Sequence, residues 1–258
     1  MNRFKKIGFI LLVVFFISVY TTDVLATEFF TGINVLFEGT DDPQEVVSTL
    51  QILFLVTIIA LAPSLLVLLS GFTRIIIVLS FARQAMATQQ MPPNQVLVGI
   101  AIFLTIFIMT PYLQEINETA LIPFGAGELS MDEAIDAMTV PLRRFMFRQI
   151  SSDSGWDTLE LFHNLADEVM YEFDDVPMSI LIPAFIVNEL MIAFIMGFLI
   201  YLPFIVVDMV VASVLMSMGM MMLPPAMISM PFKLMVFLLS GGWGILIETL
   251  MTTFQGGY

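Results

Sequence analysis

The chain has 258 residues, of which 59% are hydrophobic and only 12% are charged, whereas an ordinary soluble domain carries about 25% charged residues. This composition, with a mean hydropathy of +0.96, indicates a protein embedded in a lipid bilayer. The net charge of −14 argues against a nucleic-acid partner, because phosphates require a basic face. Without cysteine, the chain has no disulfide framework, thiol nucleophile or thiolate metal site.

The first 26 residues have the three parts of a secretory signal peptide. A basic start is followed by an apolar run that ends at Tyr20, and small residues precede a cleavage point after Ala26. We therefore expect residues 1–26 to be removed, so that an acidic N-terminal segment, 27–45, begins outside the cytoplasm. The alternative is an uncleaved first membrane helix, for which the apolar run is short.

Four apolar blocks follow, and each can supply a helix of about 20 residues, the length that crosses a bilayer. They cover residues 46–73, 84–114, about 183–207 and about 210–250. The first two predict a hydrophobic helical hairpin over 46–113, and the last two predict a second hydrophobic region over 181–258. The last block is interrupted by Pro224, Pro225 and Pro231, so a broken or re-entrant pair of helices is expected there.

Charges between the blocks orient the predicted spans. The loop expected at 73–95 carries Arg74 and Arg83 and no acidic residue before the second span, whereas residues 114–180 carry 14 Asp and Glu against three Arg. Cytoplasmic loops are enriched in Lys and Arg. The pattern therefore places the 73–95 loop in the cytoplasm and the acidic segment on the outer side of the membrane.

The acidic segment, 114–180, is predicted to be a small helical domain. Apolar residues recur at helical spacing over 131–146 and again over 156–170, and the turn-rich sequence SSDSG lies between them at 151–155. Its acidic residues are interpreted as a solvated face. The sequence thus predicts an all-α membrane protein with about four long, kinked hydrophobic helices in hairpins, and this domain between the second and third.

The sequence contains none of the catalytic motifs that we considered. His163 is the single histidine, which excludes a zinc-protease HExxH motif, and there is no GxSxG elbow, Walker A loop or GxGxxG turn. We therefore predict that the protein is not an enzyme, with no catalytic residue, no metal ligand and no cofactor.

Methionine is concentrated near the C-terminus, with eight residues between positions 216 and 235. Met220, Met221 and Met222 lie between Gly219 and the sequence Leu-Pro-Pro, which marks a helix break. Three interpretations are open: thioether ligation of Cu(I), ordinary packing by an adaptable side chain, or a deformable apolar constriction. The residues alone favour ordinary packing.

Charged residues inside the apolar blocks are the other candidate functional feature. Glu189, Asp208, Lys233 and Glu248 interrupt the C-terminal blocks. A charge at membrane depth costs at least about 2.5–3.5 kcal/mol on insertion scales, so it usually faces a partner or water. We predict that Glu189 pairs with Lys233, and that these buried charges stabilise the assembly rather than transport a substrate.

Several long strings resemble the FliP family of flagellar biosynthesis proteins, and more distantly its counterparts in virulence-type type III secretion. The strings are FTRIIIVLSFAR at 72–83, ATQQMPPNQVLVG at 87–99, PLRRFMFRQ at 141–149, NELMIAFIMGF at 188–198, GMMMLPP at 219–225 and MPFKLMVFLLSGGW at 230–243. The resemblance covers nearly everything after Gln51. Two positions depart from the family: Ala87 stands where Gly is usual, and Met191 where Lys or Arg is common.

This resemblance implies a subunit of the closed export gate, the core channel of the flagellar type III secretion apparatus, through which unfolded flagellar subunits pass. The implied partners are further copies of the chain, FliQ-like and FliR-like subunits, FlhB-like and FlhA-like export components, and the exported proteins in transit. The family also implies kinked hairpins that pack on one another in the basal body. Within it, the triplet 220–222 matches a methionine-rich loop that lines the constriction.

Two other classes of function remain open. A secondary transporter or small-solute channel subunit would show broken helices in related halves, and substrate uptake by the purified monomer would identify it. A Cu(I)-binding membrane protein would retain stoichiometric metal after purification.

Overall fold

The computed structural model describes residues 67–88, 91–150, 153–166, 176–220 and 224–255, together with positions 50, 52–54, 56, 57, 60, 61 and 64. The chain divides into two compact units, Met1–Leu66 and Val67–Tyr258. The described positions before residue 66 are helical. The expected signal peptide, its cleavage point and the acidic segment at 27–45 lie outside the described residues.

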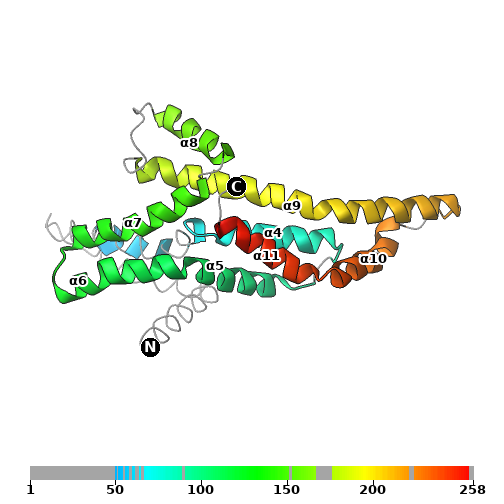
Figure 1. Cartoon of the computed structure of the whole chain (residues 1–258), viewed down its shortest axis with the longest axis horizontal. Helices are drawn as coiled ribbons and strands as arrows, with labels where there is room; N and C mark the ends of the chain where they lie inside the picture. Colours follow the sequence, from blue (N-terminus) through cyan, green and yellow to red (C-terminus); the bar gives the residue numbers. More distant parts are fainter. Residues whose placement is uncertain are drawn as a thin grey trace, which may run out of the picture. The chain divides into compact units, whose positions relative to one another are not determined.

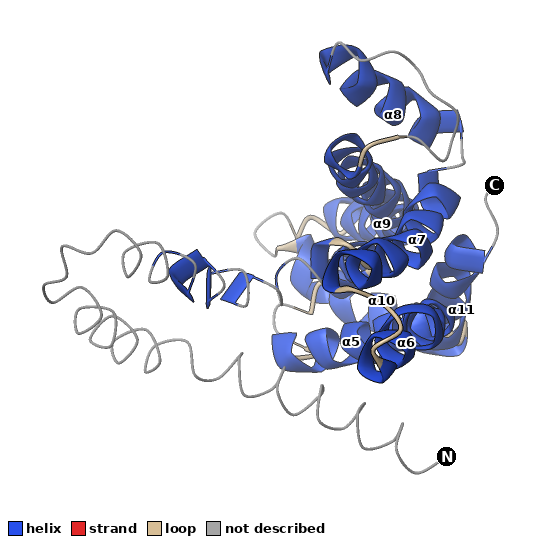
Figure 2. Cartoon of the chain, turned by 90° about the vertical axis from the view of Figure 1, so that its left-hand side faces the viewer, coloured by secondary structure: helices blue, strands red, loops and turns tan. Residues whose placement is uncertain are grey.

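The second unit is built from helices throughout its described part (Figure 1). In chain order they are α4 (Phe72–Ala85), α5 (Asn94–Ile116), the π-helix η1 (Asn117–Leu121), α6 (Ile122–Ala126), α7 (Met131–Ile150), α8 (Asp153–Ala166), α9 (Met178–Ser217), α10 (Pro225–Leu239) and α11 (Gly242–Gln255). Viewed along α9, α8 lies on one side of that helix and α5 and α11 lie on the other (Figure 2). The expected helical class is therefore confirmed.

Helix α4 occupies most of the segment that the sequence predicted to be a cytoplasmic loop, so the expected loop at 73–95 is wrong up to Ala85. Its buried residues, Arg74, Ile75, Val78, Leu79, Ala82 and Ala85, recur every three or four positions and form one face. This face packs against α9. Arg74 is buried within the fold, and Arg83 lies in the last turn of the helix, so neither basic residue belongs to a loop.

The contact between α4 and α9 depends on one glycine. Phe81 lies against Gly197, and its ring meets those of Phe194 at 5.5 Å and Tyr201 at 6.3 Å between centroids, both edge-on. A Cβ atom at residue 197 would lie 2.4 Å from the Phe81 ring, so a larger residue cannot occupy that position without displacing the ring. The missing side chain therefore lets the two helices approach closely.

Helix α9 is continuous over 40 residues, so the predicted boundary between the third and fourth apolar blocks, near residue 208, is wrong. At 1.5 Å per residue, the helix is about 60 Å long, roughly twice the thickness of a bilayer's hydrocarbon core. Two helical stretches, Asn94–Ala126 and Met178–Ser217, are long and apolar enough to cross a membrane. Because of its length, α9 cannot lie wholly within the hydrocarbon if it runs near the bilayer normal.

The C-terminal region forms a bent pair of helices, as the last apolar block predicted, but the bend is not at a proline. Pro231 lies inside α10, and the axes of α10 and α11 differ by 64°. The chain turns between them at Gly241, whose φ of 67° lies in the left-handed region that glycine adopts without strain. The bent pair is a third candidate span.

The two amphipathic helices predicted in the acidic segment are present as α7 and α8, but α8 begins at Asp153, so the expected turn at 151–155 is wrong for its last three residues. Phe145, Met146 and Ile150 of α7 are fully or almost fully buried in the main core, together with Phe185 of α9. Phe145 meets Phe185 edge-on, with 5.8 Å between ring centroids. The packing of α7 against α9 therefore joins the acidic segment to the hydrophobic helices.

Candidate functional site: two buried charge clusters and a methionine loop

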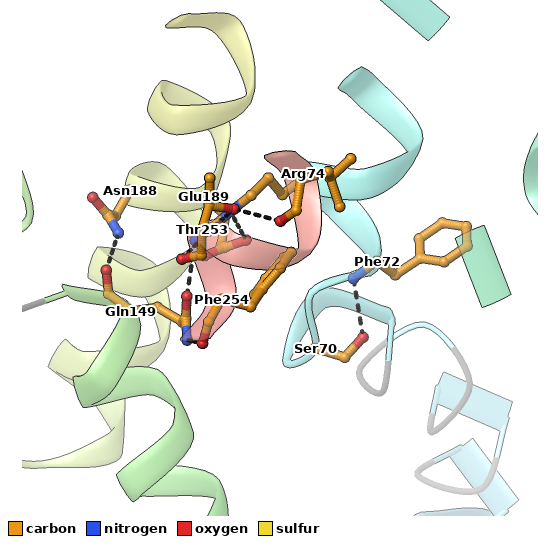
Figure 3. A network of polar contacts seen from close by, with 9 residues as sticks. Ser70, Phe72, Arg74, Gln149, Asn188, Glu189, Thr253 and Phe254 are labelled. Atoms are coloured by element: carbon orange, nitrogen blue, oxygen red, sulfur yellow. Dashed lines mark hydrogen bonds and ion pairs between the residues drawn. The ribbon is translucent and has the colours of Figure 1, made fainter. Parts of the chain in front are cut away.

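Arg74, in the first turn of α4, is the centre of a buried polar network (Figure 3). Its Nε donates to Glu189 Oε2 at 3.0 Å, and one Nη group donates to Glu189 Oε1 and to Gln149 Oε1. The other Nη group donates to the carbonyl and hydroxyl oxygens of Thr253 at 3.3 and 3.1 Å. These acceptors match the five N–H donors of a guanidinium group.

Glu189, on α9, is fully buried, and its carboxylate faces the guanidinium of Arg74. The two charges compensate each other in an apolar surrounding, where an isolated charge would cost several kcal/mol. The residue beside it, Asn188, donates to the Gln149 main-chain oxygen at 3.0 Å. Its Oδ1 atom is buried without a hydrogen-bond partner in the described structure. The network therefore joins α4, α7, α9 and α11.

A second cluster joins α9 to α10. The Nζ atom of Lys233 donates to Asp208 Oδ2 at 2.6 Å, and the Ser229 hydroxyl donates to Asp208 Oδ1 at 2.5 Å. The Lys233 side chain is almost fully buried, whereas 40% of the Asp208 side chain is exposed. Phe204 and Phe237, 6.3 Å apart between ring centroids, belong to a small apolar cluster that also contains Ala85 of α4 and the following Met86.

The predicted pair of Glu189 with Lys233 is therefore wrong, because each residue has a different partner. Sequence reasoning assigned Arg74 to a loop, since it directly follows a charge-free block, and so it missed the cation that pairs with Glu189. Helical spacing could have identified it, because Arg74 shares the face of Val78 and Ala82. The unusual Met191 does not affect this pair, whose cation comes from α4.

The methionine triplet begins where α9 ends. Gly219, at φ 75°, follows the last turn, its N–H donates to the Met216 carbonyl, and the Met220 N–H donates to the Leu215 carbonyl. These two bonds are those of a Schellman motif, which ends a helix at a left-handed glycine. Helix α10 then begins at Pro225, so the predicted helix break is confirmed.

Met220 is 41% exposed, and the nearby Met218 and Met227 are 60% and 72% exposed. The other two residues of the triplet, Met221 and Met222, lie outside the described residues. The described part of the chain therefore presents methionine side chains on both sides of the break between α9 and α10. Long unbranched thioether side chains at such a place can adapt to the shape of what they contact.

Within the described ranges, no three His, Asp or Glu side chains are grouped so that they could hold a metal ion. The ion pairs of this part of the chain instead connect helices. In addition to the two buried clusters, Arg144 of α7 pairs with Glu115 of α5 at 2.8 Å on the surface. The arrangement is that of a scaffold fixed by polar contacts.

The fold and these clusters define a membrane-embedded, all-helical protein. Residues 55–250 match the FliP family. The chain is 49% identical to the flagellar biosynthetic protein FliP of Bacillus subtilis over 217 residues, which are 84% of this chain and 96% of that protein. It is 45% identical to the protein of that name from Borreliella burgdorferi, over 87% of this chain and 89% of the relative. The corresponding Aquifex aeolicus protein is 41% identical, over 81% of this chain and 87% of the relative.

The chain therefore belongs to the FliP family. This family is part of the flagellar type III export apparatus and is a structural component of its export gate, not an enzyme. The resemblance drawn from the sequence strings is confirmed over most of the chain.

Proposed function

We propose that this chain is a subunit of the export gate of the flagellar type III secretion apparatus, required for translocation of unfolded flagellar subunits and for assembly of the flagellum. The observation that carries the proposal is the match to the FliP family over residues 55–250, with identities of 41–49% to relatives named flagellar biosynthetic protein FliP. An all-helical, membrane-embedded scaffold suits a channel subunit.

The gate is an assembly of several copies of the chain with FliQ-like and FliR-like subunits, and it works beside FlhB-like and FlhA-like components. Two features support this part of the proposal. The C-terminal half of α9 exposes large apolar side chains, among them Phe198 at 61% and Val206 at 59%, which require lipid or protein to cover them. The length of α9 also exceeds a bilayer, so protein partners must cover part of it. Native mass spectrometry of the co-expressed subunits tests this composition, and recovery of a lone monomer would contradict it.

The triplet Met220, Met221 and Met222 forms the constriction of this gate. A pore wide enough for an unfolded chain must stay closed to ions when idle, because a wet path would dissipate the membrane potential. Apolar constrictions close by dewetting, and methionine can reshape itself around a moving chain. The helix break before the triplet, made by Gly219, supports the proposal because it allows the loop to project from the bundle.

Replacement of all three methionines by alanine tests the constriction. We expect a gate that assembles but leaks ions and small dyes, because alanine removes the side-chain volume that closes it. Tryptophan replacements should slow export instead. A matched control replaces three exposed methionines elsewhere, Met91, Met131 and Met209, and should not leak. A triple-alanine variant that assembles, exports and does not leak would mean that the triplet only packs in the structure and does not close the gate.

Glu189, Asp208 and Lys233 stabilise the assembly and do not carry protons or substrate. This role is supported by the full burial of Glu189 and near-full burial of Lys233, each beside a charge of opposite sign. We expect Glu189→Ala and Lys233→Ala to reduce the recovery of the multi-subunit complex, because each leaves an uncompensated charge. If both variants assemble normally and still fail to export, the structural role is wrong.

The acidic segment faces the periplasm, and the α4–α5 connection faces the cytoplasm. Arg83, in the last turn of α4 next to this connection, supports the orientation, because cytoplasmic loops are enriched in Lys and Arg. The chain has no cysteine, so single cysteines can report the side of the membrane. A membrane-impermeant maleimide should label Gly125→Cys from the periplasm and Met91→Cys only after cell lysis. The reverse pattern would overturn the orientation.

A further inference from the structure

The last turn of α11 is held by side chains that bind its main-chain carbonyl groups. The Thr253 carbonyl accepts from Arg74, the Phe254 carbonyl accepts from Gln149 Nε2 at 3.5 Å, and the Gln255 carbonyl accepts from Arg148. The last four carbonyls of a helix have no partner inside it. Here α4 and α7 supply partners for three of these four carbonyls, and the two cations also face the negative end of the helix dipole.

Phe254 adds an apolar anchor to these contacts. Its side chain is 5% exposed, and the Arg74 guanidinium carbon lies 4.1 Å from the centre of its ring. A Cβ atom at Gly71 would lie only 2.7 Å from the same ring. The absent side chain of Gly71 therefore leaves a slot at the start of α4, and Figure 3 shows Phe254 beside Arg74.

The site that receives α11 has internal contacts of its own. The bonds from Arg74 to Glu189 and Gln149, and from Asn188 to the Gln149 main chain, do not involve α11. If the last turn of α11 separated, Arg74 would keep these partners and lose its two bonds to Thr253. The receiving side chains are therefore arranged by α4, α7 and α9 without the C-terminal helix.

Outside its last turn, α11 is held at the joint with α10 and by two leucines. The two helices are joined by the 64° bend at Gly241, where an added Cβ would meet no atom within 4 Å, whereas a Cβ at Gly242 would lie 2.3 Å from the Phe237 ring of α10. Leu246 and Leu250 reach the main core. The joint is therefore packed, and the far end of the helix is held by the carbonyl bonds and by its aromatic anchor.

We propose that α4, α7 and α9 form an intramolecular docking site for the C-terminal turn of α11, which opens and closes separately from the rest of the core. The site recognises a helix end by its main-chain carbonyls and by one aromatic ring, so it tolerates changes of other side chains but not a change of register. Docking of this turn completes the hydrogen bonds of Arg74 and fixes the α10–α11 pair.

Hydrogen–deuterium exchange on the full chain tests this site. In the unaltered protein, amides of residues 250–255 should exchange faster than those of α4 and α9, because the docked turn opens locally. Gly71→Leu should fill the slot and raise exchange at 250–255 by about 10-fold or more, with less than about 3-fold change in α4 and α9. The backbone of Gly71, with φ −69°, accepts a side chain without strain. A rise in exchange would therefore result from the collision of the new side chain with Phe254 and not from backbone strain.

Matched variants separate the slot from general damage. Gly99→Leu, where an added Cβ meets nothing within 4 Å, should leave exchange at 250–255 unchanged. Phe254→Ala should raise it, and Thr253→Val, which keeps the carbonyl, should change it little. Gly71→Ala alone should lower the protection of the amides at 250–255 against exchange. Adding Phe254→Leu to this variant should restore that protection.

Two results would overturn the proposal. Unchanged exchange at 250–255 in Gly71→Leu would mean that no slot holds the ring. Equal exchange of α11, α4 and α9 in the unaltered protein, or an equal rise in all three in the variants, would mean that the turn belongs to one cooperative core. The measurement does not involve export, so its failure would leave the proposed function standing.

Discussion

Replacing Arg74 by methionine would remove the one cation that compensates Glu189, and it tests the network most severely. Glu189 is fully buried, and removing one member of a buried ion pair typically costs about 3–5 kcal/mol, because the other charge is left uncompensated. The same variant also deprives Gln149 and Thr253 of donors, at about 1–3 kcal/mol for each acceptor left buried and unpaired.

The double variant Arg74→Met, Glu189→Leu isolates the charge effect. It leaves the same acceptors unpaired but no buried charge, so it should be more stable than Arg74→Met alone by about 3 kcal/mol. Arg83→Met is a matched control on the same helix, because the Arg83 guanidinium donates to the Pro92 carbonyl at 3.4 Å and forms no ion pair in the described structure. It should cost less than about 1 kcal/mol.

Unfolding in detergent can be followed by the fluorescence of the chain's two tryptophans, and the free energy of unfolding is obtained from that transition. A double-mutant cycle compares the two single variants with the double variant. If the single effects add to within about 0.5 kcal/mol, the two charges do not depend on each other and the proposed network energetics are wrong. A double variant that is less stable than either single variant would contradict these energetics as well.

Three further changes have defined outcomes. Ala87 has a φ of 58°, and this left-handed conformation costs a non-glycine residue about 1–2 kcal/mol. Ala87→Gly should therefore stabilise the fold by a net of about 0.5–1 kcal/mol, because the greater entropy of glycine in the unfolded chain offsets part of the gain. Thermal unfolding measures this change, and a lower melting temperature would contradict it. Gly197→Ala should cost about 1–3 kcal/mol by displacing Phe81, and unchanged stability would mean that the helices can separate freely. Two hydrogen bonds from Ser130, the larger effect from its N–H and the smaller from its hydroxyl, hold the pKa of Glu133 below its usual 4.5. The ionised carboxylate therefore stabilises the start of α7 above pH 4.5, and this stabilisation is lost as the pH falls through the lowered pKa. Glu133→Gln should abolish this pH dependence of amide exchange in the first turn of α7, and a variant that keeps it would exclude Glu133 as its source.

The sequence predicted those features that local patterns determine. Apolar residues at helical spacing predicted α7 and α8, because an amphipathic helix must bury one face. Gly219 followed by the methionines and Leu-Pro-Pro predicted the break between α9 and α10, because glycine and proline act on the backbone of their own neighbourhood. The departure at Ala87, noted from the family strings, falls at a left-handed residue after α4, a position that suits glycine.

The sequence did not predict features that depend on distant contacts. Arg74 and Glu189 are 115 residues apart, and nothing local to either residue identifies its partner. The pairing of Glu189 with Lys233 followed from sign and depth alone, which cannot distinguish between two possible cations. Asp208 was taken to separate two helices, but its pairing with Lys233 allows a carboxylate within one continuous helix.

We propose that this chain is an essential part of the gate for flagellar protein export. The most direct measurement compares flagellar subunits in the culture medium of a strain that lacks the chain and of the same strain with the chain restored. We expect no exported subunits in the first strain, with the subunits retained inside the cells, and normal export in the second. Export at the normal level without the chain would contradict the claim.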